Sequence, residues 1–297
     1  MYYLKRILAL LPLLLVISFL AFALVRVAPG GPFDKERAPA SPEVERALNE
    51  KYRLDQPLWK QYLLYLGDLA RGDFGPSMKY RHHTVGDIIK QGLPATLMLG
   101  ALSFGFAIGV GVPLGFLTAA RKGKWQDYTG SLLALVGICV PAFVIGPLLV
   151  MGFAIHWKLF PVGLWGSPLH AVLPTAALGL FYSGRVARLM REGMLGVLSE
   201  PYIMTARAKG LGEAAVLFKH ALRPALLPVV SYAGPMLADL LTGSFVIENL
   251  FQIPGIGVFM VNSSLNKDYT LIVGLVILYA TLLLVLNLLV DFLYSAL

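Results

Sequence analysis

Four polar residues lie in or just after an apolar run that is long enough to cross a membrane: Asp239, Ser244, Glu248 and Asn249. A carboxylate near the middle of a span, like Asp239 in MLADLLTGSF, is costly unless it faces water or a partner group. Asp239 is therefore predicted to line a solute pathway, and the alternative is a protonated or paired structural carboxyl group. Asp239 and Glu248 are nine positions apart, which is about 180° on an ideal helix. The pattern predicts polar residues along a passage and no single shared site.

The sequence contains none of the short motifs on which common hydrolytic enzymes depend. There is no GxxxxGK[ST] phosphate loop, no HExxH and no GxSxG. Cys139 is the only cysteine, and the adjacent imidazoles of His82 and His83 point in different directions, which favours a solvated loop over a metal site. We therefore expect the chain to be no enzyme and to hold no metal or cofactor.

The composition is that of a membrane protein. Hydrophobic residues make up 57% of the chain, charged residues make up 14%, and the mean hydropathy is +0.70, whereas a soluble domain is about one quarter charged. The net charge of +8 does not indicate nucleic-acid binding, because no basic tract is interleaved with exposed aromatic residues. The fold class predicted is an all-α integral membrane protein.

Five apolar runs can each cross a hydrocarbon core of about 30 Å. They comprise residues 7–25, 96–120, 128–155, 225–247 and 269–290. A weaker run at 168–184 reaches full length if the long stems of Arg185 and Arg188 extend to the interface. Six transmembrane helices are therefore predicted, with the first one retained.

Basic residues set the orientation. Seven lysines and arginines lie between Arg185 and Arg223, and this excess on one side places both termini in the cytoplasm. The segment 29–92 carries ten basic and nine acidic residues, so we expect it to form an extracytoplasmic domain, with an amphipathic helix that has Ser41 as N-cap and Pro42 at its first position. The predicted division is 1–28 (cytoplasmic N-terminus and first helix), 29–92 (extracytoplasmic segment) and 93–297 (transmembrane core).

The longest cytoplasmic loop is basic and rich in small residues. It begins YIMTARAKGLG at Tyr202. An interfacial helix on anionic lipid is one interpretation. Small residues such as Ala206 and Gly212 offer little apolar area to lipid, however, and they suit a short helix that docks closely in a protein groove. Gly210 is expected to end this helix in a conformation that a Cβ atom disfavours.

Several segments together resemble one known family. The order YIMTARAKGL followed by HALRPALLP, with GDFGPS, TGS, VIE, PGIG and NKDY elsewhere, is similar to the membrane subunits of ABC importers of the dipeptide, oligopeptide and nickel branch. Within the branch the resemblance is closest to the B-type oligopeptide permease subunit. The general signature begins Glu-Ala-Ala, whereas Met204, Thr205 and Ala206 stand before Gly210 here. A short basic tail expected after Tyr294 is also absent.

The resemblance implies a complex in the bacterial inner membrane. Its parts would be a homologous second permease subunit, two cytoplasmic ATPases that bind ATP and Mg, and an extracytoplasmic substrate-binding protein. Residues 192–223 would contain the coupling loop between the fourth and fifth helices, and Arg207 and Lys209 would pair with the ATPase surface, with lipid phosphates as the alternative. The residues assigned to coupling are Tyr202, Thr205, Ala206, Arg207, Ala208, Lys209, Gly210, Leu211 and Gly212.

Other transport functions stay open at this point. A permease of the same family for dipeptides, nickel or another small solute is the alternative substrate assignment. An ion-coupled secondary transporter would use Asp239 as its ion site, but inverted repeats and paired broken helices are not seen in the sequence. A channel would need a filter-like loop, for which PGIG at Pro254 is slight support.

Overall fold

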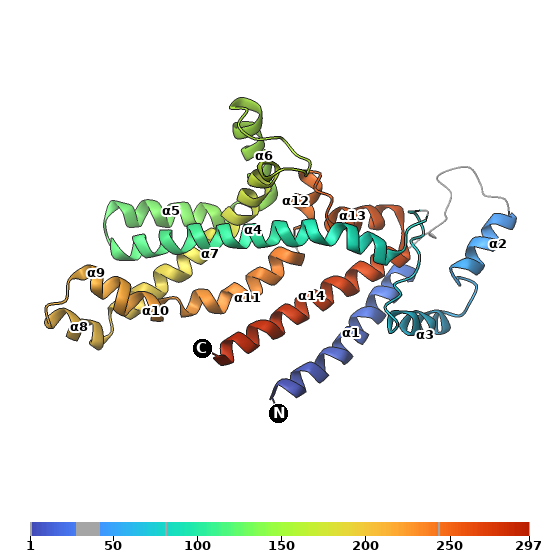
Figure 1. Ribbon diagram of the computed structural model, residues 1–297, viewed down its shortest axis with the longest axis horizontal. Helices are drawn as coiled ribbons and strands as arrows, with labels where there is room; N and C mark the ends of the chain where they lie inside the picture. The colour runs from blue at the N-terminus through green and yellow to red at the C-terminus, as the bar shows by residue number, and fades with distance from the viewer. Residues whose placement is uncertain (1, 28–41, 81, 243, 297) are drawn as a thin grey trace. The chain divides into compact units, whose positions relative to one another are not determined.

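The computed structural model describes residues 2–27, 42–80, 82–242 and 244–296. The described residues are almost entirely helical, with a single β-bridge between Pro76 and Thr84. Figure 1 shows helices α1 to α14 in chain order. Their bounds, with two π-helical stretches η1 and η2, are α1 Tyr2–Val27, α2 Pro42–Lys51, α3 Leu58–Leu69, α4 Val85–Ala120, α5 Trp125–Cys139, α6 Ala142–Leu149, η1 Val150–His156, α7 Pro168–Leu198, α8 Pro201–Ala208, α9 Glu213–Ala215, η2 Val216–Ala221, α10 Leu222–Ala225, α11 Leu227–Thr242, α12 Phe245–Leu250, α13 Ile256–Asn266 and α14 Tyr269–Ala296.

Local sequence signals set several of these helix starts. α2 begins at Pro42 and α7 at Pro168, each with proline at the first position, where its missing N–H is not needed. The predicted N-cap Ser41 lies outside the described residues. α4 begins at Val85, earlier than the predicted apolar run, because Thr84 and Asp87 cap it reciprocally: the Asp87 amide donates to the Thr84 hydroxyl at 3.1 Å, and the Thr84 amide donates to the Asp87 carboxylate at 3.0 Å.

The described helices provide four candidate membrane spans. These are Leu10–Val27, Val85–Ala120, Leu227–Leu250 and Tyr269–Leu289. The apolar run at 128–155, which is predicted to cross the membrane, is bent in the structure: α5 and the segment from α6 through η1 meet at 106°. The cause is Pro141, because the residue before a proline is held in extended conformation, and Val140 has φ −92° and ψ 117°. This bent pair makes a fifth span if it crosses the membrane as one unit.

The chain divides into two compact units. The first comprises residues 1–95 and 254–288, and the second comprises residues 96–253 and 289–297. In the first unit, α14 contributes Leu271 and Leu275 to a core that also holds Val85, Ile88 and Ile256. A buried carboxylate stabilises this unit from within: Asp268 accepts hydrogen bonds from the Ser77 hydroxyl and from the amides of Met78, Lys79 and Leu271.

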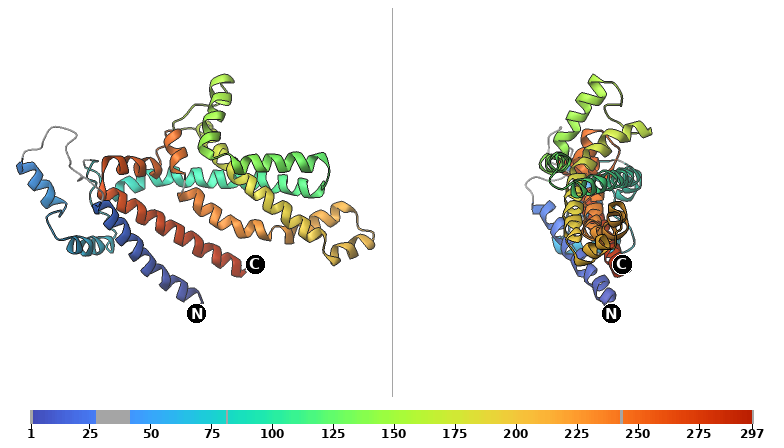
Figure 2. Two further views of the ribbon diagram at one scale, coloured as in Figure 1. Left: turned by 180° about the vertical axis from the view of Figure 1, so that it is seen from behind. Right: turned by 90° about the vertical axis from the view of Figure 1, so that its left-hand side faces the viewer.

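α7 is the central helix of the second unit. It packs against α5, α6, α10 and α11, and Figures 1 and 2 show it running obliquely past α5. Close approach depends on glycine: a Cβ at Gly115 of α4 would collide with the Ala187 carbonyl of α7, and one at Gly184 of α7 would collide with the Ala134 carbonyl of α5. The small residues therefore serve packing within the chain.

Candidate functional site: the α8 loop and the exposed face of α11

Helix α8 has one face buried in its own unit and one face exposed. Ile203 is fully buried and Ala206 is 7% exposed. On the other side Tyr202 is 46% exposed and Met204 is 63% exposed. An exposed aromatic and an exposed methionine on a short helix form an unpartnered apolar face.

The end of α8 is a Schellman turn. Gly210 has φ +81°, its amide donates to the Arg207 carbonyl at 2.9 Å, and the Leu211 amide donates to the Ala206 carbonyl at 3.3 Å. The expectation that Gly210 ends this helix in a left-handed conformation is confirmed. Gly212, two positions later, has an ordinary negative φ of −63°. Both glycines have open space where a Cβ would lie.

Arg207 is engaged within the loop. Its Nε donates to Glu213 Oε2 at 3.1 Å and its Nη2 donates to Glu213 Oε1 at 2.7 Å. The same hydrogen bonds hold the pKa of the Glu213 carboxyl group below its usual range. Glu213 thus supplies a carboxylate to this loop, which lacks the glutamate that begins the general Glu-Ala-Ala signature. Lys209 is exposed and has no partner among the described residues, so it is the cation of α8 that is free to meet another surface.

The small residues of the loop differ in where they lie. Ala206 is among the residues predicted to dock against a partner, but its side chain is buried in its own unit, where a small residue permits close packing. Ala208 and Thr205 are exposed, and so is Leu211 beyond the turn. The accessible part of the predicted set is therefore Tyr202, Thr205, Ala208, Lys209, Gly210, Leu211 and Gly212 together with the paired Arg207.

α11 presents a row of exposed residues at four-residue intervals. Ser231, Pro235 and Asp239 are exposed, whereas Val229, Met236 and Leu240 are buried. Residues four apart lie on one helix face, so Asp239 faces away from its own unit. This geometry agrees with a carboxylate that lines a passage, and it gives no support to a carboxyl group paired inside the helix packing.

A groove of about 620 Å³ lies on the same side of the second unit. α7 contributes Arg185, Arg188 and Glu192 to it, and α11 contributes Ser231 and Tyr232. Arg185 Nη1 donates to the Tyr232 hydroxyl at 3.4 Å. From the sequence, Arg185 and Arg188 are predicted to extend to the membrane interface, and Ser231 and Tyr232 have no predicted role. The available signal was the four-residue interval between Ser231, Pro235 and Asp239.

Of the other three predicted pathway residues, two are buried and one is exposed. Ser244 and Glu248 are buried, with the Ser244 hydroxyl donating to Glu248 Oε1 at 2.5 Å, whereas Asn249 is exposed. α11 ends at Thr242 and α12 begins at Phe245, so the ideal-helix angle between Asp239 and Glu248 does not apply. Ser244 and Glu248 act as a local hydrogen-bonded pair in this structure and do not face an open passage.

Comparisons with known proteins identify the family. Residues 111–297 match the family model described as "Binding-protein-dependent transport system inner membrane component". The chain is 44% identical to the oligopeptide transport system permease protein OppB of Haemophilus influenzae, over 98% of this chain and 95% of that protein. It is 44% identical to OppB of Salmonella typhimurium over 98% and 96%, and 42% identical to the dipeptide transport system permease protein DppB of Bacillus subtilis over 100% and 96%.

Solved structures share the fold. A MetNI methionine ABC transporter in an inward-facing conformation matches with a TM-score of 0.57 at 18% identity, over 70% of this chain and 95% of that chain. An amino acid ABC transporter matches with a TM-score of 0.58 at 17% identity, over 71% and 95%. The fold is therefore that of ABC transporter permeases. Together with the candidate spans, these matches make the chain a multi-pass inner membrane protein. The chain belongs to the family of binding-protein-dependent transport system inner membrane components, and it is an ABC importer membrane subunit homologous to the OppB permeases.

Proposed function

We propose that this chain forms half of the passage through which an ATP-driven importer moves oligopeptides into the cell. The observation that carries the substrate assignment is the near full-length identity of 44% to OppB proteins from two organisms. A dipeptide permease is the second candidate, because DppB of Bacillus subtilis is almost as similar at 42%. The relatives reported above are oligopeptide and dipeptide permeases, so nickel or another small solute ranks below these two candidates.

The proposed complex contains a homologous second permease subunit, two cytoplasmic ATPases and an extracytoplasmic binding protein. ATP and Mg would be bound by the ATPase subunits. Closure of the ATPase pair would move the two permease subunits between inward-open and outward-open states. The exposed face of α8, with Tyr202, Met204 and Lys209, supports its assignment as the coupling helix, because it leaves apolar area and one cation for a protein groove.

The exposed face of α11 supports the passage. In a half-passage subunit, the polar side that faces away from its own core is the side that meets the partner subunit and the solute. Asp239 and Asn249 are the pathway residues that remain in this proposal, with Ser231, Tyr232 and Arg185 added from the groove. A wide polar passage suits peptides, since selection would then rest with the binding protein.

The proposed topology has six spans, with α7 as the one outside the four or five apolar candidates. Both termini would be cytoplasmic and residues 29–92 extracytoplasmic, with residues 93–297 as the permease core. A cysteine at exposed Ala47 should react with an impermeant thiol reagent from outside, and a cysteine at Gly212 should react only from inside. These labelling reactions are carried out in a Cys139→Ala background. Both sites reacting from one side would contradict the topology.

Substrate class is tested by uptake in proteoliposomes that contain the complete complex. Labelled peptides of two and of five residues, and Ni²⁺, are offered with ATP inside and binding protein outside. The proposal expects ATP-dependent uptake of the pentapeptide. Uptake of the dipeptide alone would favour the second candidate, and uptake of Ni²⁺ alone would reject a peptide function.

A further inference from the structure

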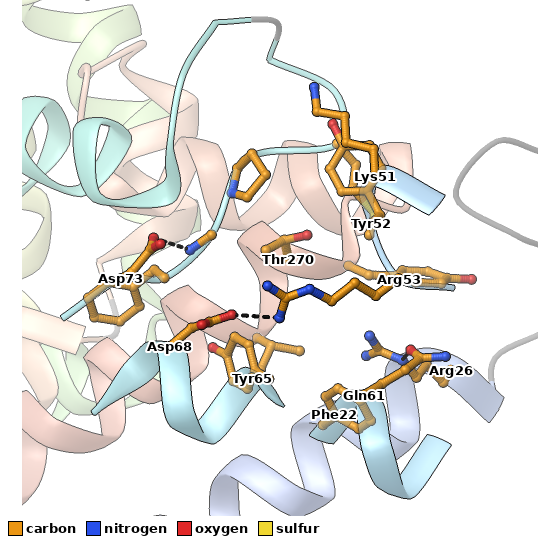
Figure 3. Close-up of a pocket in the computed structure, with 16 residues that line it drawn as sticks. Phe22, Arg26, Lys51, Tyr52, Arg53, Gln61, Tyr65, Asp68, Asp73 and Thr270 are labelled. Carbon is orange, nitrogen blue, oxygen red and sulfur yellow. Dashed lines mark hydrogen bonds and ion pairs between the residues drawn. The ribbon is translucent and has the colours of Figure 1, made fainter. Parts of the chain in front are cut away.

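The first unit contains a cavity of about 180 Å³ that is separate from the α8 loop and from the groove on α11. The end of α1, the α2–α3 connection, α3 and the start of α14 surround it (Figure 3). Its walls combine aromatic rings with charged groups. The charged residues that line it are Arg26, Lys51, Arg53, Asp68 and Asp73.

Arg26 is a partly buried charge in this cavity that has no carboxylate partner among the described residues, whereas Lys51 is exposed. Its Nε donates to Gln61 Oε1 at 2.9 Å, and its guanidinium carbon lies 3.5 Å from the centroid of the Phe22 ring. Figure 3 shows these three side chains together. Among the described residues, no carboxylate forms an ion pair with Arg26, and the hydrogen bond and ring contact above are the interactions of its guanidinium. A half-buried guanidinium without a counter-charge is unfavourable unless a ligand supplies one.

The neighbouring groups hold Arg26 in place and do not compete for it. Gln61 is 7% exposed, and its side-chain Nε2 donates to the Gln56 backbone carbonyl at 2.7 Å, which holds the side chain in place. Arg53 already pairs with Asp68 at 2.9 Å. Asp73 accepts the Gly75 amide at 2.8 Å. The three cations therefore exceed the two carboxylates, and since Lys51 is exposed, Arg26 is the partly buried cation that has no counter-charge among the described residues.

A second donor in the same cavity also lacks a partner. The Tyr65 hydroxyl is buried and makes no hydrogen bond with any residue that the structure describes. Buried hydroxyls nearly always have a partner in native structures. A ligand that accepts hydrogen bonds from both Tyr65 and Arg26 must carry several acceptor oxygens and a negative charge.

The position of Arg26 in the chain indicates which kind of oxyanion the cavity would bind. Arg26 lies one residue before the end of the candidate span Leu10–Val27, and Leu24 beside it is 69% exposed on the outside of α1. Arginines at span ends lie at the level of the lipid headgroups. We infer that this cavity binds a phosphate group, with the Arg26 guanidinium and the Tyr65 hydroxyl as its donors, and that the phosphate belongs to a membrane lipid or is free inorganic phosphate.

The test measures thermal unfolding of the delipidated full chain in an uncharged detergent. One arm titrates inorganic phosphate at constant ionic strength, and the other titrates short-chain phosphatidylglycerol. A ligand that binds only the folded chain raises the midpoint of unfolding. A rise with phosphate assigns a free-anion site, and a rise with the lipid alone assigns a headgroup site. Equal protection by acetate would reject phosphate as the ligand.

Two variants and one control distinguish the cavity from general charge effects. Arg26→Gln should raise the dissociation constant about tenfold or more, because it removes a charged donor. Arg71→Gln removes the same charge from an exposed turn that does not line the cavity, and it should bind like the wild type. If Arg26→Gln does not fold, Tyr65→Phe removes only the unpartnered hydroxyl and should weaken binding several-fold. No protection of the wild type, or equal protection of Arg26→Gln and Arg71→Gln, would overturn the inference.

Discussion

Arg191 of α7 donates two hydrogen bonds to Asp127 of α5, from Nε to Oδ1 at 2.7 Å and from Nη2 to Oδ2 at 2.9 Å. Asp127 also accepts the Gly123 amide at 3.0 Å, so one carboxylate joins the α4–α5 turn to the helix that leads into α8. Its side chain is 6% exposed, and that of Arg191 is 29% exposed. This ion pair holds the C-terminal part of α7, which precedes the α8 loop, against α5.

Removal of this carboxylate should destabilise the chain. Asp127→Ala leaves Arg191 partly buried without its partner, and we expect the free energy of unfolding to fall by about 2 kcal/mol. Unfolding of the purified chain by SDS in mixed micelles measures it. The matched control is Glu192→Ala, which breaks the exposed pair with Arg188 and should cost less than about 0.5 kcal/mol. Equal losses would show that the Asp127 pair has no special role.

Gly210 and Gly212 provide a test of the left-handed turn. Gly210→Ala places a Cβ at φ +81° and should cost about 1 kcal/mol, whereas Gly212→Ala at φ −63° should cost little. Gly210→Val should in addition abolish stimulation of ATP hydrolysis by peptide-loaded binding protein in the reconstituted complex. The permease subunits should still insert and pair. Normal stimulation in Gly210→Val would rule out this loop as the coupling element.

Lys209 should contribute more than Arg207 to association with the ATPase, because Glu213 already neutralises Arg207. Lys209→Glu is expected to weaken ATPase binding, with a larger effect at low salt than at high salt. Binding of the ATPase to the permease in detergent, measured over a range of salt concentrations, checks this. Lys122→Glu makes the same charge change in the exposed α4–α5 turn and serves as the control. A salt-independent effect would favour a steric cause.

Alanine-to-leucine changes at two positions of α8 should affect different properties, stability at Ala206 and coupling at Ala208. Ala206 is buried, so Ala206→Leu should overpack the unit and destabilise it by about 1–3 kcal/mol. Ala208 is exposed, so Ala208→Leu should leave stability unchanged and reduce the coupling of ATP hydrolysis to uptake. Thermal unfolding and ATPase activity are measured for both. A fully active Ala208→Leu complex would contradict a close fit of this face to a partner.

The two carboxylates of the predicted pathway should also behave differently. Asp239→Asn removes an exposed charge and should change peptide uptake while assembly with the partner subunit stays intact. Glu248→Gln alters a buried group that accepts the Ser244 hydroxyl, so it should lower stability by about 1–2 kcal/mol. Uptake and co-purification of the partner subunit are compared for the two variants. Lost assembly in Asp239→Asn would favour a structural role.

Some features of this protein are determined by short stretches of sequence. Pro42 and Pro168 each begin a helix, and Gly210 ends one, because the backbone preferences of proline and glycine act at their own positions. The helical membrane class follows from the apolar runs for the same reason. The bend after Cys139 also had a local cause in Pro141, but a hydropathy run of that length hides a break in direction.

Other features depend on the tertiary structure. Whether Ala206, Ser244 and Glu248 are buried depends on which residues from distant segments pack against them, and hydropathy along the chain carries no such information. The pairing of Arg191 with Asp127 joins positions 64 residues apart. The cavity at Arg26 exists because α1, α3 and α14 meet there. The sequence shows that these charges are present, but only the packing of the helices decides which of them are neutralised and which remain free to bind a partner or a ligand.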